Sequence, residues 1–320
     1  NGVEIIEEFS IWQTELNNYE YRIFLNDLIL NQKTDDYFTA KVNETGWTED
    51  YPSEYMKPLD SLYFKHPAYD YYPVVNISVE GAQLFCIWLS QEMAKVIKDN
   101  RGIPEVRLPQ VQEWKYAASS GYVFQKYPWG NFELGEDSIY MANYQPIPGN
   151  FKIDGRTTTG MSFDYFPNKY GLFGISGNAA EMAIASDSGE VGLVGGSWKS
   201  SAEEIELSHP IQEVGAVTAQ PTIGFRPIFR YLKPSDLFVN NEKDKRKPFL
   251  TEEQKKQNAK RKYEMTKKVS KMSGAVYSEF LTGSIVINGQ KEHFEPFFMQ
   301  KTEVSNIVYK TYLFDLILQK

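Results

Sequence analysis

Few side chains in this sequence have the chemistry for catalysis or for tight binding of a transition metal. The 320 residues include one cysteine, Cys86, and three histidines, His66, His209 and His293. No two histidines stand three or four positions apart, the spacing that would place both on one helix face. The sequence also lacks the Gly-x-Ser-x-Gly turn of a serine nucleophile and the glycine-rich Lys-Ser/Thr loop that binds phosphates. These absences favour a binding or structural role over nucleophilic or phosphoryl chemistry.

The single cysteine falls on the apolar face of a predicted helix. Apolar residues recur at a period of 3.6 in the set Ala82, Phe85, Cys86, Leu89, Met93, Val96 and Ile97. Ser78 is the predicted N-cap of this helix, because its hydroxyl can accept from the first backbone N–H groups. We therefore interpret Cys86 as a small core residue, and one cysteine excludes an internal disulfide.

A second, shorter helix is predicted over 110–119. Trp114, Ala117 and Ala118 share its inner face, and Gly121 lies just past its end, where a left-handed residue commonly stops a helix.

The composition bounds the class of protein. Aromatic residues make up 15% of the chain, hydrophobic residues 42% and charged residues 24%. Many large flat side chains can cover a core without long helices or sheets, so we expect many ordered loops. The net charge of −8 argues against nucleic acid as the main partner. No apolar run reaches the roughly 18 residues of a membrane-spanning helix, so none is predicted.

The positive charge is concentrated in one stretch. Between 241 and 272, lysine and arginine outnumber aspartate and glutamate by twelve to five. We expect 233–272 to be a basic linker, with a helix from about 251 that begins at the capping box Thr251-Glu252-Glu253-Gln254. Its few apolar residues favour a solvated bridging helix. The alternative is a contact for an acidic partner or for lipid headgroups.

The sequence contains an internal repeat. Residues 9–29 align without gaps to 297–317, with nine identities that include Glu15/Glu303, Asn18/Asn306 and Tyr21/Tyr309. Each copy is predicted to form a strand followed by an Asx-capped helix, with Asn306 as the cap of the second copy and Asn18 at the matching position of the first. A repeat at this distance indicates a duplicated domain, so 273–320 is expected to begin a second, incomplete copy. We expect the chain to be part of a longer tandem protein, with a lipid anchor possible upstream of Asn1.

Several segments, in a fixed order, resemble those of the formylglycine-generating enzyme (sulfatase-modifying factor) family. They are His66-Pro67, the segment from Tyr72 to Ser78 with Trp88, Arg107-Leu108-Pro109 with Glu113-Trp114, Tyr127-Pro128-Trp129-Gly130-Asn131, the segment from Asn168 to Glu181, Gly195-Gly196-Ser197-Trp198, and Gly224-Phe225-Arg226. The resemblance implies one α/β domain over 1–232, of the α+β, loop-rich kind related to the C-type lectin fold. Its glycines and tryptophans are also what turns and a loop-rich core require.

The resemblance implies where copper chemistry would lie. Members of that family oxidise a substrate cysteine with copper held by two cysteine thiolates, which suit soft Cu(I). The two matching positions here are Ser200 and Ile205. A hydroxyl is a poor ligand for Cu(I) and an isoleucine is none, so we expect no copper and no formylglycine synthesis. A related iron-dependent branch uses clustered histidines, which this sequence lacks.

The resemblance also implies two calcium sites built from oxygen atoms, the ligands that hard cations prefer. The first would use Asn143, Tyr144, Asp154 and Arg156, which could equally cap turns. The second, weaker site would use Gly177, Ala179 and Glu181, because Gly174 replaces its remaining side-chain ligand.

Two classes of function are predicted. The first is a non-catalytic structural or assembly subunit, because the domain resembles the gliding-motility and type IX secretion lipoproteins of the Bacteroidetes cell envelope. Its partners would be other proteins of an envelope complex, in the periplasm or at the outer membrane. The alternative is a lectin-like module that binds a sugar or a peptide, and an active oxidoreductase is a third, weaker reading.

Overall fold

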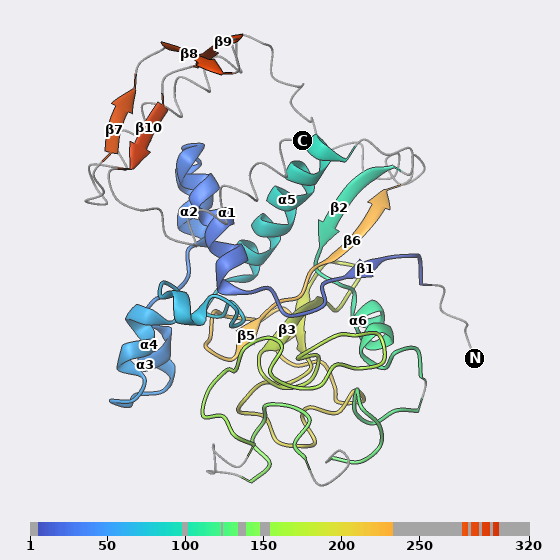
Figure 1. Cartoon of the computed structure of the whole chain (residues 1–320). Coiled ribbons are helices and arrows are strands. Elements are labelled where there is room, and N and C mark those ends of the chain that lie inside the picture. Colours follow the sequence, from blue (N-terminus) through green and yellow to red (C-terminus); the bar gives the residue numbers. More distant parts are fainter. Residues whose placement is uncertain are drawn as a thin grey trace. The chain divides into compact units, whose positions relative to one another are not determined.

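The computed structural model describes residues 6–97, 102–122, 124–133, 139–147 and 154–232, with the backbone of four strands between 277 and 300 (Figure 1). The chain divides into two compact units. The first comprises Asn1–Leu25 and Asp35–Phe238, and the second comprises Asn26–Thr34 and Val239–Lys320. Predicted positions in 233–276 and 301–320, including the basic linker helix and the second copy of the repeat helix, lie outside the described residues.

Helices dominate the beginning of the chain and short strands the rest. The elements up to 97 are β1 (Ser10–Ile11), α1 (Asn18–Leu30), α2 (Thr34–Ala40), α3 (Gly46–Asp50), α4 (Lys57–Leu62), the 3-10 helix η1 (Pro67–Tyr69) and α5 (Val79–Val96). They are followed by β2 (Ile103–Arg107), α6 (Val111–Ala118), β3 (Ala180–Ile184), β4 (Val191–Val194), β5 (Ile223–Gly224) and β6 (Ile228–Leu232). This mixture of short elements and long loops confirms the predicted α+β, loop-rich class.

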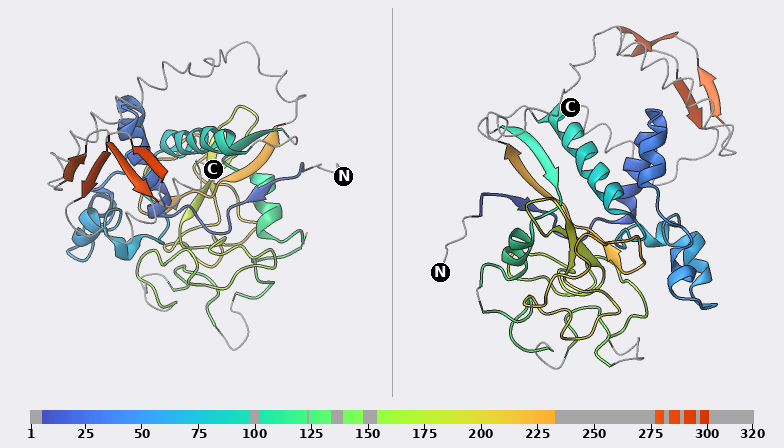
Figure 2. Two further views of the ribbon diagram at one scale, coloured as in Figure 1. Left: turned by 45° about the horizontal axis from the view of Figure 1, so that its top comes forward. Right: turned by 180° about the vertical axis from the view of Figure 1, so that it is seen from behind.

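Two small sheets organise the first unit. One is antiparallel with the order β1-β6-β2, and Phe229 of β6 pairs with Ser10 on one side and Val106 on the other. Helix α5 packs against β2, as both views of Figure 2 show. The other sheet has the order β4-β3-β5, with β3 antiparallel to β4 and parallel to β5. Irregular backbone covers the end of the unit where β3, β4 and β5 lie (Figure 1).

Both predicted helices are confirmed at their N-termini. Ser78 caps α5 by accepting a 3.0 Å hydrogen bond from the Gly81 N–H, and Cys86 is buried in the core. Helix α6 begins with a capping box between Gln110 and Glu113. Its predicted inner residues, including Trp114, are buried.

The first copy of the repeat forms the predicted strand and helix, but its cap differs from the prediction. Asn17, one residue earlier than predicted, accepts from the Glu20 N–H at 2.9 Å, and Glu20 accepts from the Asn17 N–H at 3.1 Å. Asn18 instead donates to the carbonyl oxygens of Tyr63 and Tyr69. The residue shared by both copies, Asn18, therefore makes a long-range contact rather than a helix cap.

Aromatic side chains build much of the core, as the composition predicts. Tyr21, Phe24, Phe85, Trp88 and Phe225 contact one another with ring centroids 5.3–6.3 Å apart. These contacts join α1 and α5 to the loop that follows β5. A second cluster gathers Trp47 of α3 with Tyr63 and Trp198.

In the second unit, the described strands form two antiparallel pairs. β7 (Tyr277–Phe280) pairs with β10 (Phe297–Gln300), and β8 (Gly283–Ile287) pairs with β9 (Gln290–Phe294). β10 overlaps the strand predicted at the start of the second repeat copy. Within the described part of the chain, no helix combines the length and the hydropathy needed to cross a membrane.

Candidate functional site

The two positions expected to hold copper-binding cysteines in the family lie beside the same glycine. A Cβ added to Gly196 would stand 2.8 Å from Ile205 Cγ2 and 3.1 Å from Ser200 Oγ. The turn Gly195-Gly196-Ser197-Trp198 connects β4 to this region, and Ser200 Oγ accepts from the Ser197 N–H at 3.0 Å. The fold thus brings the two side chains together, although neither is a thiol.

Ile205 belongs to the core rather than to a reactive surface. It is fully buried and packs in a cluster with Tyr127, Ala142 and Tyr144. The only cysteine, Cys86, lies on α5, and burial raises its pKa far above the ordinary value. A thiol kept protonated in this way is a poor nucleophile and a poor metal ligand.

The histidines do not assemble a metal centre among the described residues. His66 Nδ1 accepts from the Ala68 N–H at the start of η1, and His209 Nε2 contacts the Gln212 amide at 2.9 Å. His293 lies in β9 of the second unit. In the described ranges, no three side chains from His, Cys, Asp and Glu group as ligands for one ion.

The residues of the first predicted calcium site do come together. Asp154 accepts from the Tyr144 N–H at 2.8 Å through Oδ2 and from the Arg156 N–H at 3.2 Å through Oδ1. Burial raises the pKa of Asp154, and the two N–H groups oppose that shift. Asp154 therefore performs the turn-capping role, and its carboxylate and the adjoining Asn143 retain oxygen lone pairs that suit a hard cation.

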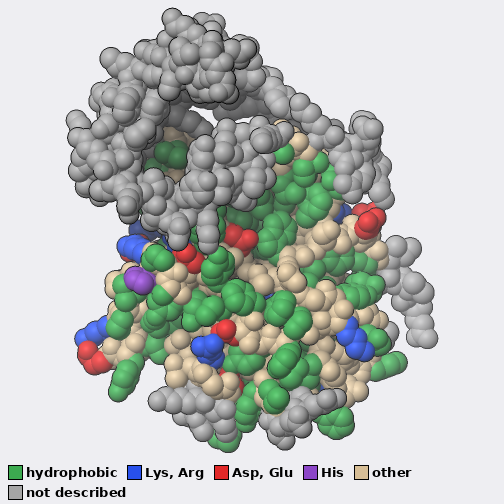
Figure 3. Space-filling view, in the orientation of Figure 1, with side chains coloured by type: hydrophobic (Ala, Val, Ile, Leu, Met, Phe, Trp, Pro, Cys, Tyr) green, Lys and Arg blue, Asp and Glu red, His purple; other side chains and the backbone are tan. Residues whose placement is uncertain are grey.

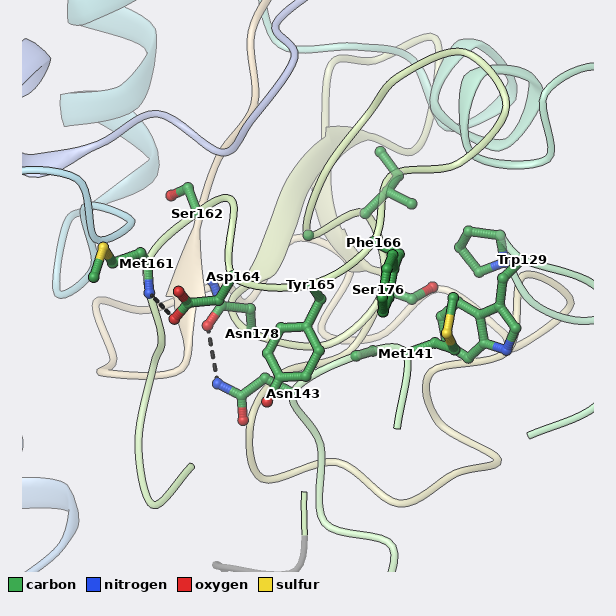
Figure 4. Close-up of a pocket in the computed structure, with 14 residues that line it drawn as sticks. Trp129, Met141, Asn143, Met161, Ser162, Asp164, Tyr165, Phe166, Ser176 and Asn178 are labelled. Carbon is green, nitrogen blue, oxygen red and sulfur yellow. Dashed lines mark hydrogen bonds between the residues drawn. The ribbon is translucent and has the colours of Figure 1, made fainter. Parts of the chain in front are cut away.

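Asn143 connects this turn to a buried amide hub at Asn178. The Asn143 amide donates to Thr158 O at 2.9 Å and to Asn178 Oδ1 at 3.0 Å. Figure 4 shows these two asparagines meeting in a pocket that Trp129 and Phe166 also line. Asn178 Oδ1 accepts in addition from the Gly160 N–H at 2.8 Å. The Asn178 side chain thus connects the loop that carries Asn143 to the loop that carries Gly160.

Asn178 also holds Glu15, which arrives from the segment between β1 and α1. The Asn178 amide donates to Glu15 Oε1 at 2.8 Å, and Glu15 is fully buried. Glu15 Oε2 accepts no hydrogen bond within the described residues. Burial, reinforced by the nearby Glu181 carboxylate, raises the pKa of Glu15 to about 8 although Arg226 opposes the shift. Glu15 is therefore mostly protonated in the folded protein at neutral pH.

At the second predicted calcium position, Glu181 is already engaged. Its carboxylate accepts from Arg226 Nη2 at 2.7 Å and from Trp114 Nε1 at 2.7 Å, and Glu181 and Arg226 are both buried. Arg226 further donates to the carbonyl oxygens of Trp12 and Phe173. A cation at Glu181 would compete with this guanidinium for the same carboxylate.

The missing ligand at Gly174 has a physical explanation. A Cβ added to Gly174 would lie 2.5 Å from Glu15 Oε2, and this glycine has a φ of +59°. The Glu15 carboxylate therefore occupies the space that a side chain at 174 would need. Because Glu181 is bound to Arg226, the residues at this second position do not fit a calcium ion. Gly177 and Ala179 instead belong to the buried turn that precedes β3.

Sequence reasoning gave no role in a site to Glu15, Asn178 or Arg226, which hold the centre of the unit together. Glu15 was noted only as an identity of the internal repeat, and the other two lie inside family motifs that were interpreted as turns and core anchors. The sequence does contain a signal for buried polar contacts, namely a charged or amide residue among glycines and apolar residues, as in Gly224-Phe225-Arg226. Such a residue must find a buried partner.

Comparisons with known proteins agree with this architecture. A family model described as the sulfatase-modifying factor enzyme 1-like domain matches residues 1–230. "Inactive C-alpha-formylglycine-generating enzyme 2" of Bos taurus is 29% identical over 41% of this chain and 40% of its own length. "Formylglycine-generating enzyme" of Thermomonospora curvata is 29% identical over 44% of this chain and 43% of its own length. The matches thus span about two fifths of these curated relatives.

Among solved structures, the crystal structure of CarF is similar to this chain. It has a TM-score of 0.47 and 20% sequence identity, and the match covers 71% of this chain and 88% of that chain.

Proposed function

The chain belongs to the sulfatase-modifying factor enzyme 1-like domain family, and from that premise we propose that its domain is a non-catalytic structural or assembly subunit. One observation carries the proposal. The fold brings positions 200 and 205 to the same glycine, but they hold a hydroxyl and a buried hydrocarbon in place of two thiols. Without thiolates, Cu(I) has no soft ligand at this point, so copper would not activate oxygen here.

We propose that the subunit serves a cell-envelope complex of secretion or gliding machinery, in the periplasm or at the outer membrane. The support is the resemblance of its motifs to the lipoproteins of such complexes. The basic stretch between 241 and 272 and the repeat suit a scaffold that contacts several proteins. A lipid anchor upstream belongs to the same proposal.

The repeat supports a second domain that begins near 273. In the first copy, the residues shared with the second copy make long-range contacts. Glu15 binds Asn178, Asn18 binds the carbonyl of Tyr63, and the Tyr21 hydroxyl donates to Ala40 O at 2.8 Å. These contacts need the rest of a domain, so Glu303, Asn306 and Tyr309 are expected to serve a domain of their own.

Calcium at the first site is a further part of the proposal. Asn143, Asp154 and the adjoining carbonyl groups of Tyr144 and Arg156 would hold the ion, which would supply no redox chemistry. Its contribution would be to fix the loop that carries Asp154 onto the turn at Tyr144.

Two assays, of which the first uses purified full chain, test the catalytic and assembly claims separately. The first incubates the protein with copper, oxygen and a cysteine-containing sulfatase peptide, beside an active formylglycine-generating enzyme as control. We expect no aldehyde from this chain, and turnover would overturn the non-catalytic claim. The second isolates the chain under native conditions from the envelope of its own cells. Partner proteins in fixed stoichiometry are expected, and a chain that returns alone would contradict the assembly role.

A further inference from the structure

Three half-exposed tyrosines and a lysine lie near the end of helix α6 and take no part in the candidate site. On the face seen in Figure 3, hydrophobic side chains gather at several places. Tyr116, Tyr122 and Tyr170 are 45%, 50% and 52% exposed and are linked to one another or to Lys169. We call these four residues the tyrosine platform.

The side chains of the platform contact one another in two pairs. The rings of Tyr116 and Tyr170 lie 6.2 Å apart at an angle of 52°, and their hydroxyl groups are 3.4 Å apart. The Lys169 ammonium stands 4.3 Å from the centre of the Tyr122 ring and donates to its hydroxyl at 3.2 Å. The platform therefore combines aromatic rings with hydroxyl and ammonium groups, and Lys169 lies over one face of the Tyr122 ring.

A buried side chain beneath the platform fixes it to the fold. Asn168 donates to the carbonyl oxygens of Ala117 and Ala118 at the end of α6, at 2.8 and 3.0 Å. Its own oxygen accepts from the N–H groups of Tyr170 and Leu172, both at 3.0 Å. The loop that carries Lys169 and Tyr170 is thus attached to the helix that carries Tyr116. A surface ordered in advance binds a ligand without the cost of arranging its side chains.

The chemistry of the platform limits its ligand. Each aromatic ring ends in a hydroxyl, and Lys169 adds a further donor, so a dry apolar partner would leave these groups unsatisfied. A pyranose ring offers an apolar C–H face for each aromatic face and a hydroxyl at nearly every carbon. Neighbouring sugar hydroxyls can accept from and donate to the tyrosine hydroxyls, and a sugar carboxylate would also suit the ammonium of Lys169.

We propose that the tyrosine platform is a binding site for polysaccharide chains, and this inference goes beyond the assembly role. The sugar stacks on Tyr116 and Tyr170 and is oriented by their hydroxyl groups and by Lys169. No metal takes part in the contact. A scaffold of an envelope complex would thereby attach to surrounding glycan as well as to protein.

Affinity electrophoresis of the full chain through gels with soluble polysaccharides tests the proposal. The probes are a neutral β-glucan, xylan, polygalacturonate and alginate, with chelator present throughout. At least one should retard the wild-type chain. Tyr170→Ala and Tyr116→Ala should each weaken that retardation about tenfold, while Tyr170→Phe, which keeps the ring, should lose less. A preference for the two acidic polymers that disappears in Lys169→Ala would identify a carboxylate ligand.

Tyr55→Ala is the matched control, because Tyr55 is 89% exposed and lies between α3 and α4, outside the platform. Melting temperatures establish that each variant is folded. Three outcomes would overturn the proposal: no retardation by any probe, equal losses in Tyr55→Ala and Tyr170→Ala, or cross-linking from position 170 that reaches a partner protein and no glycan. None of these outcomes bears on copper or on peptide turnover, so the non-catalytic proposal would stand or fall separately.

Discussion

Two regions of the first unit differ in the contacts that hold their side chains in place. Beside Gly196, at the two positions that the proposal compares with the family's thiolates, Ser200 accepts one hydrogen bond from the Ser197 N–H and Ile205 packs in an apolar cluster. Around Asn178 and Arg226, buried polar side chains hold one another across the chain, from Glu15 to Glu181. The first region holds a hydroxyl and an apolar side chain close together, whereas the second consists of polar groups that bind one another in the core.

The difference follows from how many partners each side chain has. Arg226 serves a carboxylate and two backbone carbonyls, so its replacement would leave three acceptors unsatisfied in a dry interior. The Ile205 side chain makes only packing contacts, so its replacement would leave no hydrogen-bonding group unsatisfied. A side chain held by packing alone can therefore be replaced at a lower cost in stability than a member of an interlocked buried network.

The largest expected effect comes from breaking the network at Arg226. Arg226→Met leaves Glu181 as an unpaired buried charge, so the free energy of unfolding should fall by about 3–5 kcal/mol. Arg230→Met is the matched control, because Arg230 pairs with Glu105 at a partly exposed site and should cost about 1 kcal/mol or less. Urea unfolding monitored by tryptophan fluorescence gives both values, and similar losses in the two variants would contradict this contrast.

Calcium should have the next largest effect. An ion bound only to the folded state, at 100 times its dissociation constant, would raise the free energy of unfolding by about 2.7 kcal/mol. The melting temperature should therefore drop on chelation. Asp154→Ala should remove this response, while Glu181→Gln, despite its own cost in stability, should keep it. Identical melting of chelated and calcium-loaded wild-type protein would exclude the ion.

Glu15 should make stability depend on pH. The unfolded carboxyl loses its proton near 4.5, whereas the folded carboxyl keeps it to about 8. The unfolded state thus binds fewer protons in between, so this contribution is complete at low pH and is lost as pH rises from 4.5 to about 8. Between pH 6 and 7 the loss should approach about 1.4 kcal/mol. Glu15→Gln should flatten this part of the profile, and an unchanged slope in that variant would assign the titration to another group.

The smallest effects are expected at Ser200 and Ile205. Ile205→Val should cost about 1 kcal/mol, as expected for one buried methyl group. Ser200→Ala should cost a similar amount or less, since it removes one partly buried hydrogen bond to the Ser197 N–H. Chemical denaturation of both variants checks these values. Losses as large as that of Arg226→Met would show that this region is also part of an interlocked network.

Local sequence signals predicted the elements better than the contacts between them. The cap at Ser78, the apolar face with Cys86 and the inner face of α6 follow from period and capping chemistry alone. The helix after β1 was also predicted, but its cap was misplaced by one residue, because two adjacent asparagines have the same local propensity. Only the tertiary contact of Asn18 with Tyr63 distinguishes them.

The residues of the candidate site could be predicted from the sequence, but the long-range hydrogen bonds between them could not. The motif order identified the positions of Ser200, Ile205, Asn143 and Asp154, and the structure brings each group together. The link from Glu15 to Asn178 joins residues 163 positions apart, and no local pattern encodes such a pairing. The occupation of the space beside Gly174 by Glu15 likewise appears only in three dimensions.

A copper(I) titration of wild-type protein and of cysteine variants, competed against a chromophoric chelator, tests the central claim most directly. If the fold keeps the geometry of the site and lacks only its thiolates, the double variant Ser200→Cys/Ile205→Cys should bind one Cu(I) per chain. Wild-type protein should bind none, and each single variant should bind much more weakly than the double. Cys86 is present in all four proteins and provides the internal control. Tight stoichiometric copper on the wild-type chain, or a folded double variant with no more affinity than the wild type, would contradict the account.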